Sequence, residues 1–326
     1  MVIYEFELAD LAQTRFAISP VHELVSGLRL LRNPDRGALH VPWVREALPI
    51  ARQLDLELAL LLAPPKGYMP DFLTPPPSSP VASFEEELDL LRTMSADQVR
   101  TDVGHLFDRR RPPEPVRRLV ERPRSQLERL ASGLEEFWRQ ALEPHWPRIR
   151  ALLEADLAYR SRRLTQGGQA RLFADLHPAV RWNRDRLEVR MKHEVTVALR
   201  DQGLLLVPSV FIWQKPSAMV DPPWQPTLVY PARGVGLLWE PVPDEPTEAM
   251  AGLVGRRRAE LLEALAAPAS TTELAARLDI SPGGVSQHLS AMRAAALVAG
   301  QRQGRSVLYA RTELAERLLE SAGTVA

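Results

Sequence analysis

The chain has 326 residues, of which 45% are hydrophobic and 25% are charged, and its formal net charge is zero. This length suits two or more domains, and the balanced charge means that nucleic-acid binding would have to rest on a local patch. Cysteine is absent, which excludes disulfides, zinc–thiolate sites and thiol nucleophiles.

The N-terminal segment MVIYEFELAD contains no basic region followed by an apolar run, so it does not read as a secretory signal. The apolar run LELALLLA is too short to cross a bilayer. We therefore expect a cytoplasmic protein without a membrane partner.

Helical patterns dominate the chain up to about Leu176. Ser19 and Pro20 provide an N-cap and a first helical residue, and Ser83 and Ser95 each precede a further amphipathic segment. A longer helical pattern follows, with a break at Pro144. VIYEFEL at the start of the chain alternates in the manner of a strand, which allows it to join a sheet.

The sequence pattern changes from helical to strand-like between Val180 and Trp239, where LEVRM, VTVAL, LLLVPSVFIW and PTLVY are flanked by turn residues. We predict an α+β fold: a large, mostly helical N-terminal domain, residues 1–240, with an antiparallel sheet portion. The string EPVPDEPTE holds three prolines and four acids, so residues 241–248 are interpreted as a linker.

The remaining segment, residues 249–326, contains the strongest motif. Ser270 and Glu273 form a capping box that opens one helix, and Ser281 followed by Pro282 opens a second after a short turn. Two short helices across a tight turn, the second with a polar outer face, describe a helix-turn-helix. The DNA-binding residues predicted on the second helix are Ser281, Gly283, Gly284, Ser286, Gln287, His288 and Ser290.

Gly283 and Gly284 are unusual in a first helical turn, because glycine is a poor helix former. Helix N-termini attract phosphate, and the lack of side chains would let the DNA backbone approach closely. The alternative is that the two glycines form a loose helix start. The following LVAGQRQGRSVLYAR predicts a β-hairpin whose tip carries Arg302 and Arg305, a basic wing beside the recognition helix.

The segment ISPGGVSQHLSAMRAAALVAGQRQGRSVLYAR resembles the core of ArsR-type winged-helix repressors. The matching positions are Ser281, Val285, Ser286, His288, Leu289, Leu297 and Val298. The resemblance implies a homodimer in which the first and last helices of the domain pack together, and it implies double-stranded DNA as a partner. Metal-sensing members place cysteines or acid–histidine pairs in helices that carry neither cysteine nor histidine here, so we expect neither a metal site nor a cofactor.

The N-terminal region resembles a domain of unknown function that precedes ArsR-type winged helices in actinobacterial regulators. The resemblance rests on FLTPPPSSP, EPHWPRIRALLEADLAYRSRRL, DLHPAVRW and DPPWQPTLVYPARGVGLLWE, among others. It implies the same architecture and transfers no activity. A His-Glu-x-x-His pair, a dinucleotide loop, a P-loop and a Gly-x-Ser-x-Gly elbow are all missing from the sequence, so we expect no enzyme.

A small-molecule effector would fit between the helices and the sheet, because aromatic side chains commonly line ligand pockets. The candidates are Trp213, Trp224, Tyr230 and Trp239, although any single one of them is more often a core residue. The sequence thus predicts a DNA-binding transcriptional regulator of ArsR type, whose N-terminal domain senses a signal or organises the dimer. An enzyme domain tethered to a DNA-binding module, and an architectural protein without an effector, are the alternatives.

Overall fold

The computed structural model describes residues 1–33, 38–108, 110–192, 194–212, 215–239, 246–266, 268–303 and 306–323. The chain divides into an N-terminal unit, Met1–Trp239, and a C-terminal unit, Glu240–Ala326. Both units combine helices with sheets, which confirms the predicted α+β class. Within the described residues, no helix has both the length and the apolar character that a membrane span requires.

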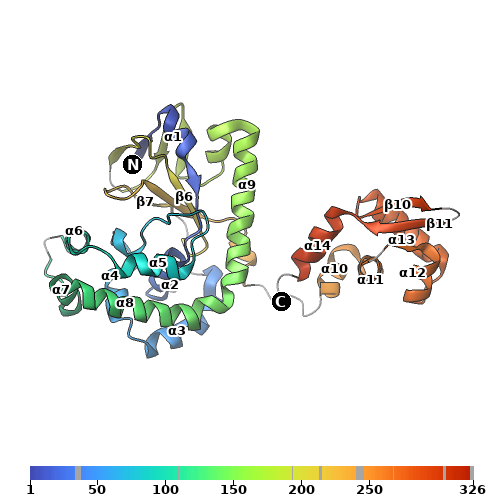
Figure 1. Cartoon of the computed structure of the whole chain (residues 1–326), viewed down its shortest axis with the longest axis horizontal. Helices are drawn as coiled ribbons and strands as arrows, with labels where there is room; N and C mark the ends of the chain where they lie inside the picture. Colours follow the sequence, from blue (N-terminus) through green and yellow to red (C-terminus); the bar gives the residue numbers. More distant parts are fainter. Residues whose placement is uncertain are drawn as a thin grey trace. The chain divides into compact units, whose positions relative to one another are not determined.

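Most helices of the N-terminal unit pack around one large core. We call these helices and their core the helical half. Figure 1 shows these helices on one side of the unit and the strands on the other. The helices of this half are α2 (Pro20–Leu31), α3 (Val41–Gln53), α4 (Glu57–Leu62), α5 (Phe84–Arg92), α6 (Ala96–Phe107), α7 (Glu114–Glu121) and α8 (Pro123–Phe137). A short α1 (Leu8–Gln13) lies apart from them, and α9 (Trp146–Phe173) follows the break predicted near Pro144.

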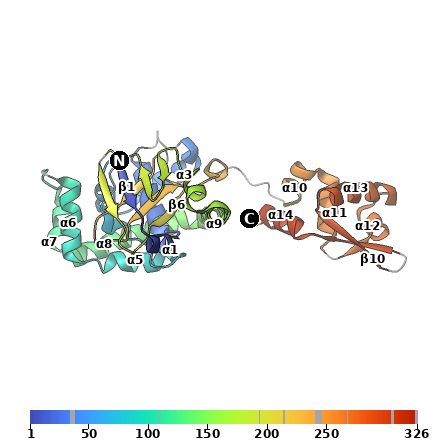
Figure 2. The same cartoon turned by 90° about the horizontal axis from the view of Figure 1, so that it is seen from above.

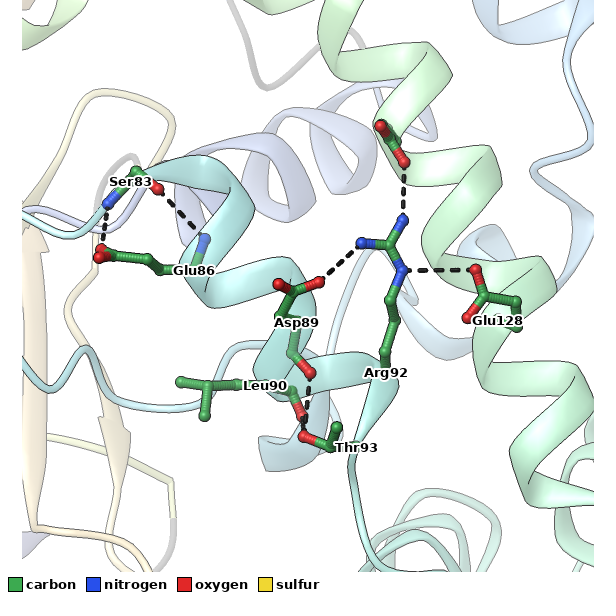
Figure 3. Close-up of polar contacts among 8 residues, drawn as sticks. Ser83, Glu86, Asp89, Leu90, Arg92, Thr93 and Glu128 are labelled. Carbon is green, nitrogen blue, oxygen red and sulfur yellow. Dashed lines mark hydrogen bonds and ion pairs between the residues drawn. The ribbon is translucent and has the colours of Figure 1, made fainter.

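Local capping and ion pairing join α5 to α8 (Figure 3). The Ser83 hydroxyl accepts the N–H of Glu86 at 3.1 Å, and the Glu86 carboxylate accepts the N–H of Ser83 at 2.9 Å. At the other end of α5, the Arg92 guanidinium pairs with Glu135 at 2.7 Å and Glu128 at 3.4 Å, both on α8. The predicted cap therefore begins α5, and the ion pairs with α8 add to the apolar contacts that both helices make in the shared core.

The strands of the N-terminal unit form two four-stranded sheets in the orders β3-β4-β1-β5 and β2-β6-β8-β7. Their bounds are β1 (Val2–Glu5), β2 (Arg15–Phe16), β3 (Val180–Asn183), β4 (Arg186–Val189), β5 (Val195–Ala198), β6 (Leu205–Ser209), β7 (Ser217–Met219) and β8 (Thr227–Pro231). The N-terminal strand joins the first sheet as the alternation allowed.

The sheet portion is mixed, where the sequence predicted an antiparallel one. β3–β4, β1–β4 and β7–β8 are antiparallel, whereas β1–β5, β2–β6 and β6–β8 are parallel. A turn of a few residues can join only antiparallel neighbours, and a parallel pair needs a longer crossover. The parallel pairs here join strands that are not consecutive in the chain, so local turn signals could not reveal their direction.

The helix α9 connects the helical half with a second core, which we call the strand half. Ile149 and Leu153 near its start are buried in the first core, and Leu172 and Phe173 near its end are buried among the strands. Figure 1 shows α9 running past both halves. The helix is kinked at Gly168, whose φ of 62° is a left-handed conformation that glycine adopts easily.

A buried polar network holds the middle of α9 against β8. The Tyr230 hydroxyl donates to the Asp156 carboxylate at 2.8 Å, and the Arg160 guanidinium pairs with Asp175 at 2.6 Å. Asp156 and Arg160 lie one helical turn apart and are both almost fully buried. Charges can stay in such a dry place because they are paired and hydrogen-bonded.

A second buried contact joins the helical half to the strand half. The Glu23 carboxylate on α2 accepts the backbone N–H groups of Val210 at 3.2 Å and Phe211 at 3.4 Å, just beyond β6. Burial raises the pKa of Glu23 to about 8. Glu87 on α5 makes a similar contact within the helical half, where it accepts the N–H of Val21 on α2 at 2.8 Å. Burial also raises the pKa of Glu87 to about 8.

The C-terminal unit has its own core. Its elements are α10 (Pro246–Val254), α11 (Arg256–Ala264), β9 (Ala269–Ser270), α12 (Thr271–Leu278), α13 (Pro282–Ala294), β10 (Val298–Gln303), β11 (Ser306–Arg311) and α14 (Glu313–Gly323). Within this unit, the β10–β11 hairpin projects from the helices (Figure 2). Residues 241–245 of the expected linker lie outside the described residues, and residues 246–248 form the first turn of α10, where proline is tolerated.

The two raised carboxyl pKa values predict how stability depends on pH. Glu23 and Glu87 keep their protons to about pH 8 in the folded chain, whereas ordinary glutamates lose them near 4.5. The folded state then binds more protons, so its free energy of unfolding falls with rising pH, by up to about 1.4 kcal/mol per pH unit for each carboxyl. Burial lowers the pKa of His22 and His40 to about 4, which has the opposite effect at acid pH. The fall should therefore be clearest between about pH 7 and pH 8.

Glu23→Gln should reduce this slope, because it removes one of the titrating groups. Urea unfolding of the full chain at a series of pH values measures the effect, with the exposed Glu85→Gln as the control. An unchanged slope in Glu23→Gln, or a wild-type stability that rises from pH 7 to 8, would contradict this prediction.

Candidate nucleic-acid interface

The helices α12 and α13 are built by the local signals that the sequence contains. The Ser270 hydroxyl accepts the N–H of Glu273, whose carboxylate accepts the N–H of Ser270 at 2.7 Å, completing the predicted capping box. Asp279 ends α12 in a left-handed conformation with φ 50°. Ser281 then caps α13, so the two helices are separated by a tight turn as predicted.

The two faces of α13 are sharply different. Val285, Leu289 and Met292 are almost fully buried in the core of the C-terminal unit. Opposite them lie polar or small residues, which matches the expected recognition face. Of the residues predicted to contact DNA, Ser281, Gly283, Ser286, Gln287 and Ser290 are exposed, and Gly284 and His288 are half-buried.

One backbone N–H group remains for an anion in the first turn of α13. The Ser281 hydroxyl already accepts the N–H of Gly284 at 3.1 Å, and Pro282 has no N–H. Within the described part of the chain, the N–H of Gly283 has no acceptor. A helix N-terminus carries partial positive charge, so this exposed N–H can donate to a phosphate.

The two glycines have different surroundings. A Cβ atom placed on Gly283 would meet nothing within 4 Å, whereas one on Gly284 would lie 3.3 Å from the Ser281 hydroxyl. At Gly284 a side chain would crowd the hydroxyl of the capping Ser281, so the cap itself partly explains this glycine. The sequence did not suggest this reason. At Gly283 the surrounding protein does not require glycine, and the close approach of an external partner stays a prediction.

The predicted wing is an antiparallel hairpin. β10 and β11 pair from Val298↔Arg311 to Gln303↔Ser306, and β9 adds a third strand beside β11. Arg302 lies in β10, but its side chain is outside the described residues, as is the whole of Arg305. The hairpin is therefore confirmed, and the DNA contacts of its two arginines stay predictions.

Arg293 is a candidate contact that the sequence analysis missed. It is exposed near the end of α13 and follows Ser286 by seven residues and Ser290 by three, so all three share one helix face. This helical spacing could have revealed it. Arg311, by contrast, is occupied internally: it donates to the carbonyl of Leu262 at 2.6 Å and pairs with Glu316 at 3.2 Å.

The aromatic residues predicted for an effector pocket lie mostly in cores. Tyr230 is buried in the strand half, and Trp224 and Trp239 pack against the helical half. The Trp239 indole donates to His40 at 2.9 Å. Trp213 lies outside the described residues. A cleft of about 960 Å³ does lie between the helices and the strands, but it is lined by other residues than these three.

No group of three or more histidine, aspartate or glutamate side chains with the arrangement of metal ligands occurs among the described residues.

Two family comparisons agree with this division of the chain. Residues 257–301, from α11 to β10, match a helix-turn-helix domain family, and residues 108–236 match a family of unknown function (DUF5937). No curated protein and no solved structure matches the chain. The C-terminal unit is thus a helix-turn-helix domain with a hairpin wing, and this domain indicates a DNA-binding regulator. The N-terminal match covers residues 108–236 and supplies no activity.

The surroundings of Gly283 predict the effect of filling its space. Gly283→Leu should fold normally, because the new side chain meets no neighbour and leucine is the better helix former. It should weaken DNA binding about tenfold, equivalent to about 1.4 kcal/mol, by keeping a phosphate from the helix start.

The matched control is Gly104→Leu in α6, a helical glycine that is also exposed and without neighbours within 4 Å. Circular dichroism checks folding, and fluorescence anisotropy with labelled DNA measures affinity. Wild-type affinity in a folded Gly283→Leu variant would show that the glycine serves no close approach.

Proposed function

We propose that the chain is a cytoplasmic, sequence-specific transcriptional regulator of ArsR type, which binds double-stranded DNA as a homodimer. The observation that carries this proposal is the exposed polar face of α13, with its capped N-terminus, next to the β10–β11 hairpin. In this arrangement α13 enters the major groove and the hairpin lies along the backbone or an adjacent groove. The N-terminal unit senses a small molecule or organises the dimer.

Different parts of this surface have different tasks. Gln287 is exposed on α13 and carries an amide that can bind adenine through two hydrogen bonds, so it reads sequence. Ser286 and His288 hold phosphates or the groove edge. Arg293 on the same helix, with Arg302 and Arg305 at the wing, contributes charge that every DNA sequence attracts.

Two substitutions separate sequence reading from charge. Gln287→Ala should cost about 1–3 kcal/mol at one base position and relax the preference there. Arg293→Ala should weaken all sequences alike and reduce the slope of log affinity against log salt by about 1. Footprinting on the DNA upstream of the gene identifies the operator, and titrations at several salt concentrations measure both effects.

The proposal would fail if the full chain bound this DNA no better than unrelated DNA of the same length. Equal losses on operator and unrelated DNA for Gln287→Ala would remove this residue from sequence reading while leaving the regulator proposal intact.

Exposed leucines support the proposed homodimer. Leu253 on α10 is 68% exposed and Leu314 on α14 is 48% exposed, and the two helices pack side by side. The ArsR resemblance puts the contact between subunits on the segment RRRAELLEALAAP, which contains α11, and on α14. The helix α10 packs against both of them and adds Leu253. A dimer also suits recognition helices that must lie roughly 34 Å apart to enter successive major grooves.

The double variant Leu253→Glu/Leu314→Glu should therefore be monomeric at concentrations where the wild type is dimeric, because buried unpaired carboxylates oppose association. Light scattering after size exclusion measures the mass. Leu8→Glu is the control, since Leu8 in α1 is 86% exposed. A double variant that stays dimeric would place the interface elsewhere.

We also propose that regulation needs no metal and that the N-terminal unit has no catalytic role. The chain has no cysteine, and the segments of α12 and α14 contain no histidine, which supports a metal-independent regulator. Operator affinity should stay constant when zinc, nickel or arsenite is added at stoichiometric concentration. Release of the DNA by any of them would contradict this part of the proposal.

A further inference from the structure

The cleft in the N-terminal unit lies between α2, the loops on either side of Asp71 and the strands β6 to β8. Its volume is about 960 Å³. Clefts of this size hold small organic molecules, typically against an apolar wall with a few polar groups that orient the ligand.

Both kinds of wall are present. Phe211, Ile212 and Met219 supply apolar surface from the strand side. His22 and Ser26 face the cleft from α2, and both are almost fully buried. The Ser26 hydroxyl and the Nδ1 atom of His22 are 3.3 Å apart. The cleft therefore combines an apolar side with buried polar groups.

The charge around the cleft is strongly one-sided. The chain has 41 basic residues, and three of them are lysines: Lys66, Lys192 and Lys215. All three lysines line this cleft, together with Arg29 and Arg190. Lysine is a flexible point charge and a common ligand of phosphate groups. Their gathering in one cleft of an arginine-rich chain indicates a specific use.

Negative charge does not balance these cations. Asp71 is the one acidic residue among those that line the described cleft. Burial, with the nearby charges of Asp102 and Asp221, raises its pKa to about 7, so its own charge is weakened near neutral pH.

Arg29 is the most enclosed of the cations. It donates to the carbonyls of Pro64 at 2.9 Å and Gly67 at 3.0 Å, and within the described residues it has no carboxylate partner. Burial lowers its pKa, and burial together with its charge lowers the pKa of His22 to about 4. A partly buried cation without a counter-ion is unfavourable, and a bound anion would relieve this cost.

We propose that this cleft binds a small organic anion, whose phosphate or carboxylate lies among the lysines and whose apolar part contacts the Phe211 wall. This site differs from the aromatic cluster suggested by the sequence. Its use in regulation rests on the proposed function, whereas anion binding does not. The test is therefore made on the full chain without DNA, so that the two proposals can fail separately.

The fluorescent anion 8-anilinonaphthalene-1-sulfonate is titrated into the protein, and three competitors with the same alkyl chain then displace it. Octyl phosphate and octanoate carry a charge, and octan-1-ol does not. At low salt the better of the two anions should compete about tenfold more strongly than the alcohol, and the advantage should shrink as salt rises. The ranking of phosphate and carboxylate identifies the preferred headgroup.

The triple variant Lys66→Gln/Lys192→Gln/Lys215→Gln should lose this preference while keeping its affinity for octan-1-ol. The control replaces three exposed arginines away from the cleft, Arg45→Gln/Arg52→Gln/Arg124→Gln, and should keep the preference. Equal competition by the alcohol and both anions in the wild type would overturn the proposal. An anion preference that survives in the triple variant would also overturn it. If the triple variant does not fold, the competition between the alcohol and the two anions in the wild type decides the test.

Discussion

The arrangement of the N-terminal unit depends on a carboxyl group that is buried where its charged form is unfavourable. Glu23 projects from α2 and accepts the N–H groups of Val210 and Phe211, which would otherwise lie unpaired beyond the end of β6. Both oxygens of Glu23 and both N–H groups have hydrogen-bond partners, because each oxygen lies next to a backbone donor. It joins α2 to the segment that follows β6, whose residues Phe211 and Ile212 line the cleft.

The helix α9 also carries buried polar side chains that have hydrogen-bonded partners. Its ends belong to two different cores, and its middle carries Asp156 and Arg160 in a dry environment. The Tyr230 hydroxyl and the Asp175 carboxylate provide the partners that make this burial tolerable. Polar contacts therefore join the two halves in addition to apolar packing, since Val210, Phe211 and Val235 from the strand region belong to the core of the helical half.

The C-terminal unit is organised by short-range interactions around a separate core. The caps at Ser270 and Ser281 start two helices at defined residues, and the buried stripe of α13 turns its polar face outward. The face that can meet DNA is thus determined by the same periodicity that builds the core. The N-terminal unit contributes a different kind of site, whose cations come from segments far apart in the chain.

The sequence by itself determined the features that arise within about ten residues of chain. Ser19, Ser83, Ser270 and Ser281 were recognisable as caps, and the hairpin around Gln303 was recognisable from alternation, because these signals act through neighbouring backbone groups. The exposed residues of α13, including Ser286 and Gln287, followed from helical spacing. Arg293 shares that face and was within reach of the same reasoning.

Only the tertiary structure decided which distant segments meet. Parallel pairing of β6 with β8, the contact from Glu23 to Val210 and the gathering of Lys66, Lys192 and Lys215 have no local signature. The aromatic residues suggested a pocket, but Tyr230, Trp224 and Trp239 pack in or against the two cores. Large rings stabilise the fold most when they are packed in a core. Long-range packing depends on the whole chain at once, whereas a cap or a helical stripe depends on a few neighbours.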